Sequence, residues 1–171
     1  AFRIFNPDGS EAEKCGNGLR IFARFLYDLQ LVDNKAFYLN TLGGRVQAEV
    51  LSAEQIRVEM GRVSFLSKEI PVTGPVREVL QEKITVKDRD FIYSAANIGN
   101  PHCIIFADEI NPELAKEYGP DLEKHSNFPN KINVQFVKII DKNTIALEIW
   151  ERGAGYTLAS GSSACACGAT A

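Results

Sequence analysis

From Gly161 to Ala171 the chain consists only of small residues: Gly, Ser, Ala, Cys and Thr. This run follows a β-like segment and predicts a helix with no large side chain on any face. Such a helix is slim enough to thread a closed β-sheet, whose interior is normally filled by side chains. A sheet wrapped around a helix is therefore among the folds open to this chain.

A similar pattern opens the first predicted helix. Cys15-Gly16-Asn17-Gly18 and Ser160-Gly161-Ser162-Ser163 each give a nucleophile-type residue, a glycine, a small polar residue and a further small residue. Each copy follows a β segment, so the pair indicates a duplicated unit. Glycine-rich segments are also common before helices, and composition alone favours this second explanation.

Length and charge exclude several classes of protein. The 171 residues correspond to one domain or two small ones, and 19 basic against 22 acidic residues give a net charge of −3. This balance argues against nucleic acid as a partner. No apolar run approaches the ~18 residues of a membrane span. The chain starts at Ala1 without a signal peptide and ends inside a predicted helix, so we expect it to be part of a longer protein.

The four cysteines, Cys15, Cys103, Cys165 and Cys167, are too few for a disulfide scaffold in a chain of this length. In the absence of a secretory signal they favour the reducing cytoplasm. Cys165 and Cys167 are too close in sequence for a usual zinc site, and on a helix they face different ways. We therefore expect small core residues there and predict no metal site.

The coarse pattern predicts a β-rich chain with a few helices. Strands are expected over residues 2–5, 36–41, 45–51, 55–60, 90–97, 103–107, 132–140 and 144–151. Helices are expected over 16–30, over 112–118, where Gly119-Pro120 should end the helix, and from 161 onward. Residues 61–75 contain two prolines and two glycines and predict a linker between two lobes.

Cys15 directly precedes the first predicted helix. Backbone N–H groups and the positive end of a helix dipole favour the thiolate form of a cysteine at such a position, where it can act as a nucleophile or a general base. A buried, inert thiol is the commoner fate of a single cysteine. The neighbours Lys14, Gly16 and Asn17 are unlike a core sequence and favour a functional role.

Other polar residues are candidates for binding. Arg152 is followed by Gly153 and Gly155 and can bind a carboxylate through two N–H groups, although a solvated salt bridge with Glu151 is the alternative. His102 follows a tight turn and is more often a structural histidine than a catalyst. Asn133 lies in an apolar β segment, where its amide needs the backbone or a ligand as a partner.

Taken together, these segments resemble the diaminopimelate epimerases. Phe5-Asn6-Pro7-Asp8-Gly9-Ser10, followed by Glu13-Lys14-Cys15-Gly16-Asn17-Gly18-Leu19-Arg20, is similar to the first active-site signature of that family. Gly99-Asn100-Pro101-His102 is similar to the central motif, and the segment from Trp150 to Ser162 is similar to the second signature. The motifs come in family order and at family spacing. The resemblance implies about 60 further residues before this chain and a few tens after it.

The resemblance implies an α+β fold of two pseudo-symmetric lobes, each a mostly antiparallel β-sheet or barrel wrapped around a central helix. Residues 1–60 would form part of the N-terminal lobe and residues 61–171 most of the C-terminal lobe. The implied activity is the epimerisation of LL-diaminopimelate to meso-diaminopimelate, in lysine and peptidoglycan precursor biosynthesis, without pyridoxal phosphate, metal or any other cofactor. The implied partner is this small amino acid, with no membrane partner, and a homodimer is one state open to the chain.

Individual residues carry over from the resemblance. Cys15 matches the first catalytic cysteine, which removes the α-proton while a thiol on the opposite face returns one. Gly16 with Asn17, and Gly161 with Ser162, match the two helix starts, whose backbone N–H groups bind the α-carboxylate. His102 matches a histidine beside the reacting centre. The distal end of diaminopimelate would be held by Asn6, Asn100, Asn133, Glu151 and Arg152.

Ser160 departs from the family pattern, which has the second catalytic cysteine at this position. A serine hydroxyl is a far weaker acid than a thiol and a poor base. Three explanations are open: an engineered substitution that disables the enzyme, natural divergence towards the dehydration of a related amino acid, and a non-catalytic amino-acid-binding protein. Because every other motif position is kept, we favour the first.

Two other enzyme or redox classes are disfavoured. A serine hydrolase would use Ser160 as its nucleophile and His102 as its base, but Leu158-Ala159-Ser160-Gly161-Ser162 lacks the G-x-S-x-G pattern. A thiol redox module would require a C-x-x-C pair, which the sequence lacks.

Overall fold

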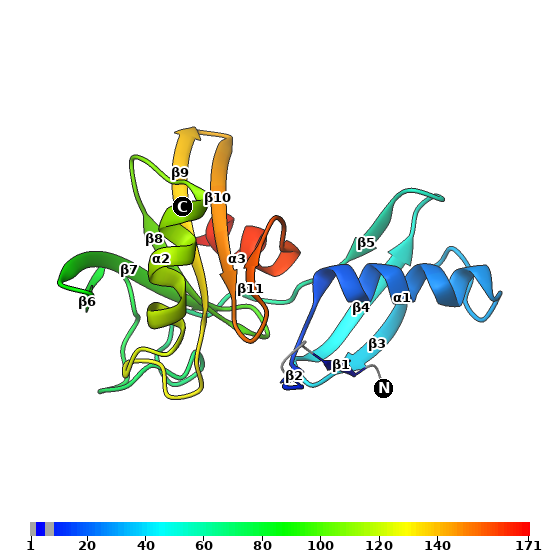
Figure 1. Cartoon of the computed structure of the whole chain (residues 1–171). Helices are drawn as coiled ribbons and strands as arrows, with labels where there is room; N and C mark the ends of the chain where they lie inside the picture. Colours follow the sequence, from blue (N-terminus) through cyan, green and yellow to red (C-terminus); the bar gives the residue numbers. More distant parts are fainter. Residues whose placement is uncertain (1–2, 6–8) are drawn as a thin grey trace.

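The computed structural model describes residues 3–5 and 9–171 and shows two parts side by side (Figure 1). The N-terminal part contains a two-stranded and a three-stranded sheet with one helix, and the C-terminal part contains a six-stranded sheet with two helices. The expected α+β fold with mostly antiparallel sheets is confirmed. The lobe boundary at residue 61 stays a prediction.

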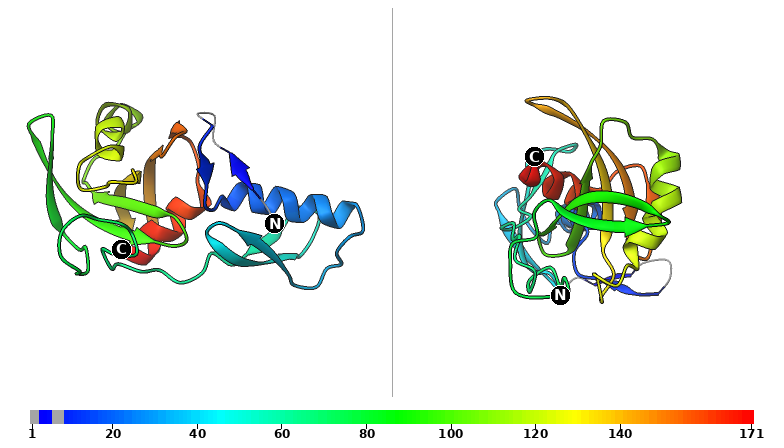
Figure 2. Two further views of the ribbon diagram at one scale, coloured as in Figure 1. Left: turned by 90° about the horizontal axis from the view of Figure 1, so that it is seen from below. Right: turned by 90° about the vertical axis from the view of Figure 1, so that its left-hand side faces the viewer.

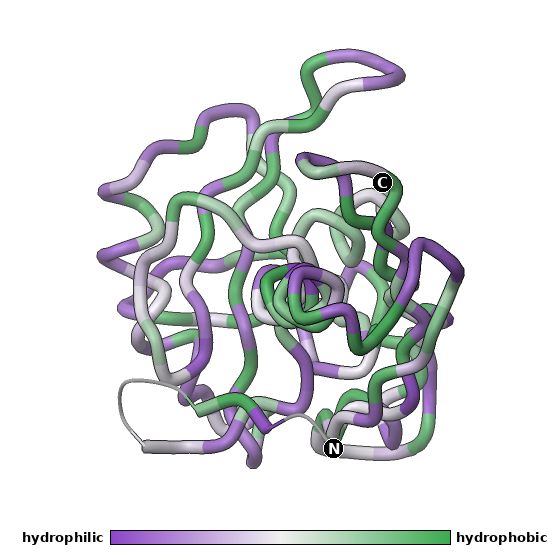
Figure 3. Tube along the Cα trace, turned by 90° about the vertical axis from the view of Figure 1, so that its right-hand side faces the viewer, coloured by the Kyte–Doolittle hydropathy of each residue, from purple (hydrophilic) through white to green (hydrophobic). Residues whose placement is uncertain are grey.

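The N-terminal part is built on helix α1 (Gly16–Asp28). Strands β1 (Ile4–Phe5) and β2 (Glu11–Ala12) pair ahead of it, and β3 (Phe37–Thr41), β4 (Gly44–Val50) and β5 (Ile56–Val58) form the antiparallel three-stranded sheet. Leu19 and Ala23 of α1 are fully buried against this sheet. Figure 3 shows α1 nearly end-on, with hydrophobic residues on more than one face of the helix. Ile21 and Phe25 are exposed.

The six-stranded sheet of the C-terminal part has the order β11-β10-β9-β8-β7-β6. Only the β8–β9 pair is parallel, because helix α2 (Pro112–Glu123) carries the chain back between these two strands. The strands are β6 (Glu82–Val86), β7 (Arg89–Asn97), β8 (Pro101–Phe106), β9 (Asn133–Asp141), β10 (Thr144–Glu151) and β11 (Gly155–Thr157).

Helices α2 and α3 (Gly161–Thr170) cover opposite faces of this sheet. Adjacent residues of β7 show this, because Ala95 packs in the cluster that contains α2, whereas Ala96 packs with Ala166 and Cys167 of α3. The small residues of α3 let it contact strands β7 to β10. Two further views show α3 beginning next to the first turn of α1 (Figure 2). Within the described residues, no helix is long and apolar enough to cross a membrane.

Several expectations about elements and packing are wrong, among them that of a buried Cys165, which is exposed. Helix α2 does not end before Gly119-Pro120 but continues to Glu123, because burial of Leu122 in the core outweighs the hydrogen bond that Pro120 cannot make. The end of the predicted linker belongs to the C-terminal part, since Ile70 and Val72 are buried in its core. Strands β2, β6 and β11 were not expected; all three are short, and β6 and β11 lie at the two edges of the six-stranded sheet.

Gly119 tests the packing of α2 on β10. A Cβ at this position would lie 2.6 Å from both Cβ and Cγ of Trp150. We expect Gly119→Ala to lower the free energy of unfolding by about 1–3 kcal/mol, as overpacking does. Gly168→Ala is the matched control, because an added Cβ there meets nothing within 4 Å, and it should be neutral or stabilising. Urea unfolding of both variants measures the difference; equal stabilities would contradict the packing described here.

Candidate active site

Cys15 and Ser160 occupy equivalent positions at the starts of α1 and α3. Cys15 is the N-cap of α1, with φ −139° and ψ 112°, and its Sγ accepts a hydrogen bond of 3.3 Å from Gly18 N. Ser160 is the N-cap of α3, with φ −145° and ψ 121°, and its Oγ accepts one of 3.5 Å from Ser163 N. The repeated sequence pattern therefore corresponds to a repeated local structure.

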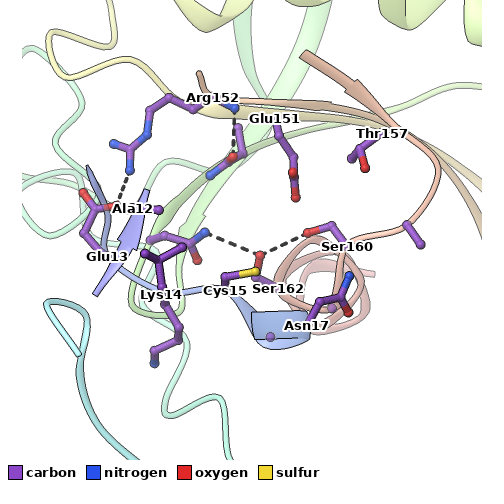
Figure 4. Close-up of a pocket in the computed structure, with 16 residues that line it drawn as sticks. Ala12, Glu13, Lys14, Cys15, Asn17, Glu151, Arg152, Thr157, Ser160 and Ser162 are labelled. Atoms are coloured by element: carbon purple, nitrogen blue, oxygen red, sulfur yellow. Dashed lines mark hydrogen bonds and ion pairs between the residues drawn. The ribbon is translucent and has the colours of Figure 1, made fainter. Parts of the chain in front are cut away.

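The two helix starts lie against each other. A Cβ built on Gly16 would be 3.7 Å from the Cα of Gly161. Both caps line one cavity of about 130 Å³, in which their side chains approach from opposite parts of the chain (Figure 4). The other residues that line it are Ile4, Ala12, Glu13, Lys14, Gly16, Asn17, Asn100, Asn133, Glu151, Arg152, Thr157, Ala159, Gly161 and Ser162.

This arrangement favours an anion in the cavity. The first turns of α1 and α3 present backbone N–H groups that have no partner within the helix, and the positive ends of both helix dipoles meet at the same place. A carboxylate is the anion that such a helix start binds readily. The chemistry of the cavity is therefore set by the backbone as much as by side chains.

Two asparagines fix the polar wall of the cavity. The Asn133 amide donates to Pro101 O at 2.8 Å and accepts from Arg152 N at 3.0 Å, so of the two kinds of partner expected for it, backbone or ligand, the structure shows the backbone. Asn100 donates to Ser162 Oγ at 3.4 Å. These bonds connect the starts of β8 and β9 with the turn after β10 and the start of α3.

Arg152 binds a carboxylate within the protein itself. Its guanidinium forms an ion pair with Glu13, which comes from the N-terminal part, and donates to Asn130 O at 3.2 Å. Glu151 lines the cavity beside it (Figure 4). The expectation that Arg152 and Glu151 pair only with each other in solvent does not describe this site. Sequence reasoning missed Glu13, because a contact with Arg152 across so many residues leaves no local pattern.

His102 is not among the residues that line the cavity but is in contact with Asn100, which does line it. His102 is fully buried, and its Nε2 is 3.0 Å from Asn100 Oδ1. Burial, with a smaller contribution from the charge of Arg152, lowers the pKa of His102 to about 3, although Gln135 opposes the shift. The imidazole is therefore neutral near pH 7. The Ser160 hydroxyl lies 3.3 Å from Ser162 Oγ, and His102 is bonded to Asn100, so the geometry gives no support to a Ser160–His102 hydrolase pair.

Four of the remaining predicted site residues line the cavity, and the fifth is outside the part of the chain that the structure describes. Gly16, Asn17, Gly161 and Ser162 line the cavity, and Asn6 lies outside the described residues. A further residue, Glu123, was missed. Its buried carboxylate accepts hydrogen bonds from Trp150 Nε1 at 2.8 Å and from Gly153 N at 3.2 Å, and it thereby holds the turn that carries Arg152.

Comparison with known proteins decides the family. The model of the family described as "Diaminopimelate epimerase" matches residues 1–66 and 94–171. The chain belongs to the diaminopimelate epimerase family. It is 59% identical to diaminopimelate epimerase 2 of Nostoc sp. over 100% of this chain and 60% of the relative. It is 40% identical to diaminopimelate epimerase of Methanococcus maripaludis over 96% of this chain and 61% of the relative. The chain thus spans about 60% of the length of these relatives.

Solved structures share the fold. A hydroxyproline epimerase from Agrobacterium vitis superposes with a TM-score of 0.65 and 14% identity, over 91% of this chain and 50% of that one. A Bacillus anthracis phenazine biosynthesis protein of the PhzF family gives a TM-score of 0.54 and 19% identity, over 95% of this chain and 57% of that one. At these identities the likeness supports the fold alone.

The buried His102 makes stability depend on pH. Its pKa is about 3 in the folded protein against 6.5 for the ordinary side chain, so the unfolded state binds one more proton between these values. Above pH 6.5 the imidazole is neutral in both states, and His102 does not lower the free energy of unfolding. Below pH 6.5 the free energy of unfolding falls by up to about 1.4 kcal/mol per pH unit. Urea unfolding between pH 7 and 5 should show this slope, and His102→Gln should flatten it. His125→Gln is the control; an unchanged slope in the His102 variant would contradict this assignment.

Proposed function

We propose that this chain is the greater part of a cofactor-independent amino-acid epimerase that acts on diaminopimelate, interconverting the LL and meso forms. The single observation that carries the proposal is the meeting of two N-capped helix starts, with Cys15 on one and Ser160 on the other, at one cavity. Family relatives named for this activity add support. We further propose that the enzyme acts in the cytoplasm, in lysine and peptidoglycan precursor biosynthesis.

The reaction needs a base and an acid on opposite faces of one carbon. The Cys15 thiolate takes the α-proton and becomes a thiol, leaving a carbanion whose charge spreads into the α-carboxylate. The N–H groups at the starts of α1 and α3 stabilise this charge. A proton delivered to the other face completes the inversion and leaves its donor as the new base. No cofactor is required in this scheme.

Ser160 limits the second half of this scheme. Its hydroxyl occupies the position of the opposing group, and it is 3.3 Å from Ser162 Oγ. A hydroxyl gives up its proton far less readily than a thiol, so both proton delivery and proton removal on this face are slow. We infer that Cys15 still removes a proton from its own face, whereas complete inversion is strongly impaired.

Substrate choice would depend on the part of the cavity that Arg152 and Glu151 line. Arg152 can bind a distal carboxylate in place of Glu13, and Glu151 can accept from a distal ammonium. Asn133 and Asn100 keep this end polar and fixed through their backbone and side-chain bonds. An amino acid without the distal groups would leave these polar atoms unpaired and would bind weakly.

Ser160→Cys should restore epimerisation. Losing one general acid or base typically lowers a rate by about 10²–10⁴-fold, so a gain of that order is expected in the variant. The parent protein should exchange the α-proton of only the stereoisomer whose proton faces Cys15, and Cys15→Ser should abolish this exchange. NMR of LL- and meso-diaminopimelate in deuterated buffer follows both reactions. Full epimerisation with Ser160 in place, or no gain in Ser160→Cys, would refute the two-thiol scheme.

Arg152→Ala should weaken the binding of diaminopimelate. Truncating one partner of a part-buried, hydrogen-bonded charge pair costs about 2–5 kcal/mol, or at least roughly thirtyfold in Kd. Isothermal calorimetry on the unreactive Cys15→Ser background measures the affinity without turnover. Arg57→Ala is the matched control, because Arg57 pairs with Glu49 on the exposed side of the three-stranded sheet. Equal affinities in the two variants would show that the distal pocket is wrongly assigned.

A further inference from the structure

Lys14 is a buried lysine directly before Cys15. Only 6% of the residue is exposed. Its Nζ donates to Met60 O at 2.9 Å and to Ile98 O at 3.1 Å. Met60 follows β5 of the N-terminal part, whereas Ile98 lies in the turn between β7 and β8 of the C-terminal part. One ammonium group therefore joins the backbones of both parts.

The surroundings of Lys14 are shaped to receive its side chain. A Cβ built on Gly99 would lie 2.5 Å from Lys14 Nζ and 3.1 Å from Gly43 O, and Gly99 has φ +101°. The turn between β3 and β4 also reaches this point, because Gly43 N donates to Glu13 O at 2.8 Å. The β3–β4 turn, the β7–β8 turn and the connection after β5 thus all contact the two residues that precede Cys15.

The connections on either side of Lys14 lead to the cavity. Within the chain, its neighbours are Glu13, which pairs with Arg152, and Cys15. Lys14 Nζ binds Ile98 O, and the turn that contains Ile98 continues to Asn100, which donates to Ser162 at the start of α3. In Figure 4 the side chain of Lys14 points away from the Cys15 thiol, so it supports the site from behind.

We propose that Lys14 is a positioning residue, which holds the Cys15 thiol at the start of α1 against the start of α3 by binding backbone carbonyls of both parts. Its effect on turnover rests on the proposed function, but its effect on the Cys15 thiol does not. Burial lowers the pKa of the Lys14 ammonium and Glu59 opposes this shift. The two carbonyl bonds therefore hold a group that is unfavourable to bury, as expected for a residue kept for geometry.

The thiol itself provides the first test. Lys14→Met keeps the length and removes the donor, Lys14→Gln keeps a donor, and Lys35→Met is the control, since 85% of the Lys35 side chain is exposed. Iodoacetamide labelling at pH 7.5, read peptide by peptide by mass spectrometry, compares Cys15 with the exposed Cys165 in the same molecule. We expect the Cys15 to Cys165 rate ratio to fall about fivefold in Lys14→Met, less in Lys14→Gln, and not in the control.

Turnover provides the second test. With diaminopimelate, α-proton exchange by folded Lys14→Met should lose at least about tenfold in kcat, because misplacing a catalytic group slows the proton transfer. The KM should stay within a factor of about three, and Lys14→Gln should recover part of the rate. A loss confined to KM would overturn a positioning role.

The outcomes separate this proposal from the proposed function. An unchanged Cys15 to Cys165 ratio in folded Lys14→Met overturns the role of Lys14. If Lys14→Met does not fold, Lys14→Gln decides in the same way, since a ratio equal to that of the parent overturns the proposal. If the ratio falls as expected while the parent shows no exchange with diaminopimelate, Lys14 keeps its role and the proposed substrate is wrong.

Discussion

Two helix N-termini that point at one cavity form the constraint on which this structure depends. Both ends carry partial positive charge, so bringing Gly16 close to Gly161 is electrostatically unfavourable in the absence of an anion. Contacts elsewhere between the two parts must offset this repulsion. The same partial positive charges attract a carboxylate that enters the cavity. The arrangement that is unfavourable without an anion is therefore the one that would stabilise a developing negative charge.

Next to Cys15, the contacts that offset this repulsion are polar. Glu13 pairs with Arg152, and Lys14 binds Ile98 O across the two parts. These bonds have defined directions, unlike apolar contacts, and they fix the relative orientation of the two caps. Their residues flank Cys15 on its N-terminal side, so the geometry of the thiol and the docking of the two parts are set by the same short segment.

Local patterns predicted the parts of the site that depend on neighbours in sequence. The capped starts at Cys15 and Ser160 and the strands on either side of the Asp141-Lys142-Asn143 turn follow from short-range rules and are present. Sequence patterns failed where packing decides. Helix α2 passes through Pro120 because Leu122 is buried beyond it. The buried placement of His102 and the long-range bonds of Glu123 and Lys14 leave no periodic signal.

The serine at position 160 shows how chemistry and architecture separate in this fold. Serine is among the best N-cap residues, and Ser160 accepts from Ser163 N with the same backbone geometry that Cys15 has at α1. A hydroxyl there satisfies the helix start at least as well as a thiol would, so N-capping does not disfavour serine at this position. What differs is only how readily the side chain gives up a proton. Under the proposed function, the backbone donors and polar wall of the cavity would be retained while one face carries a hydroxyl in place of a thiol, so binding and one-sided proton exchange would outlast inversion.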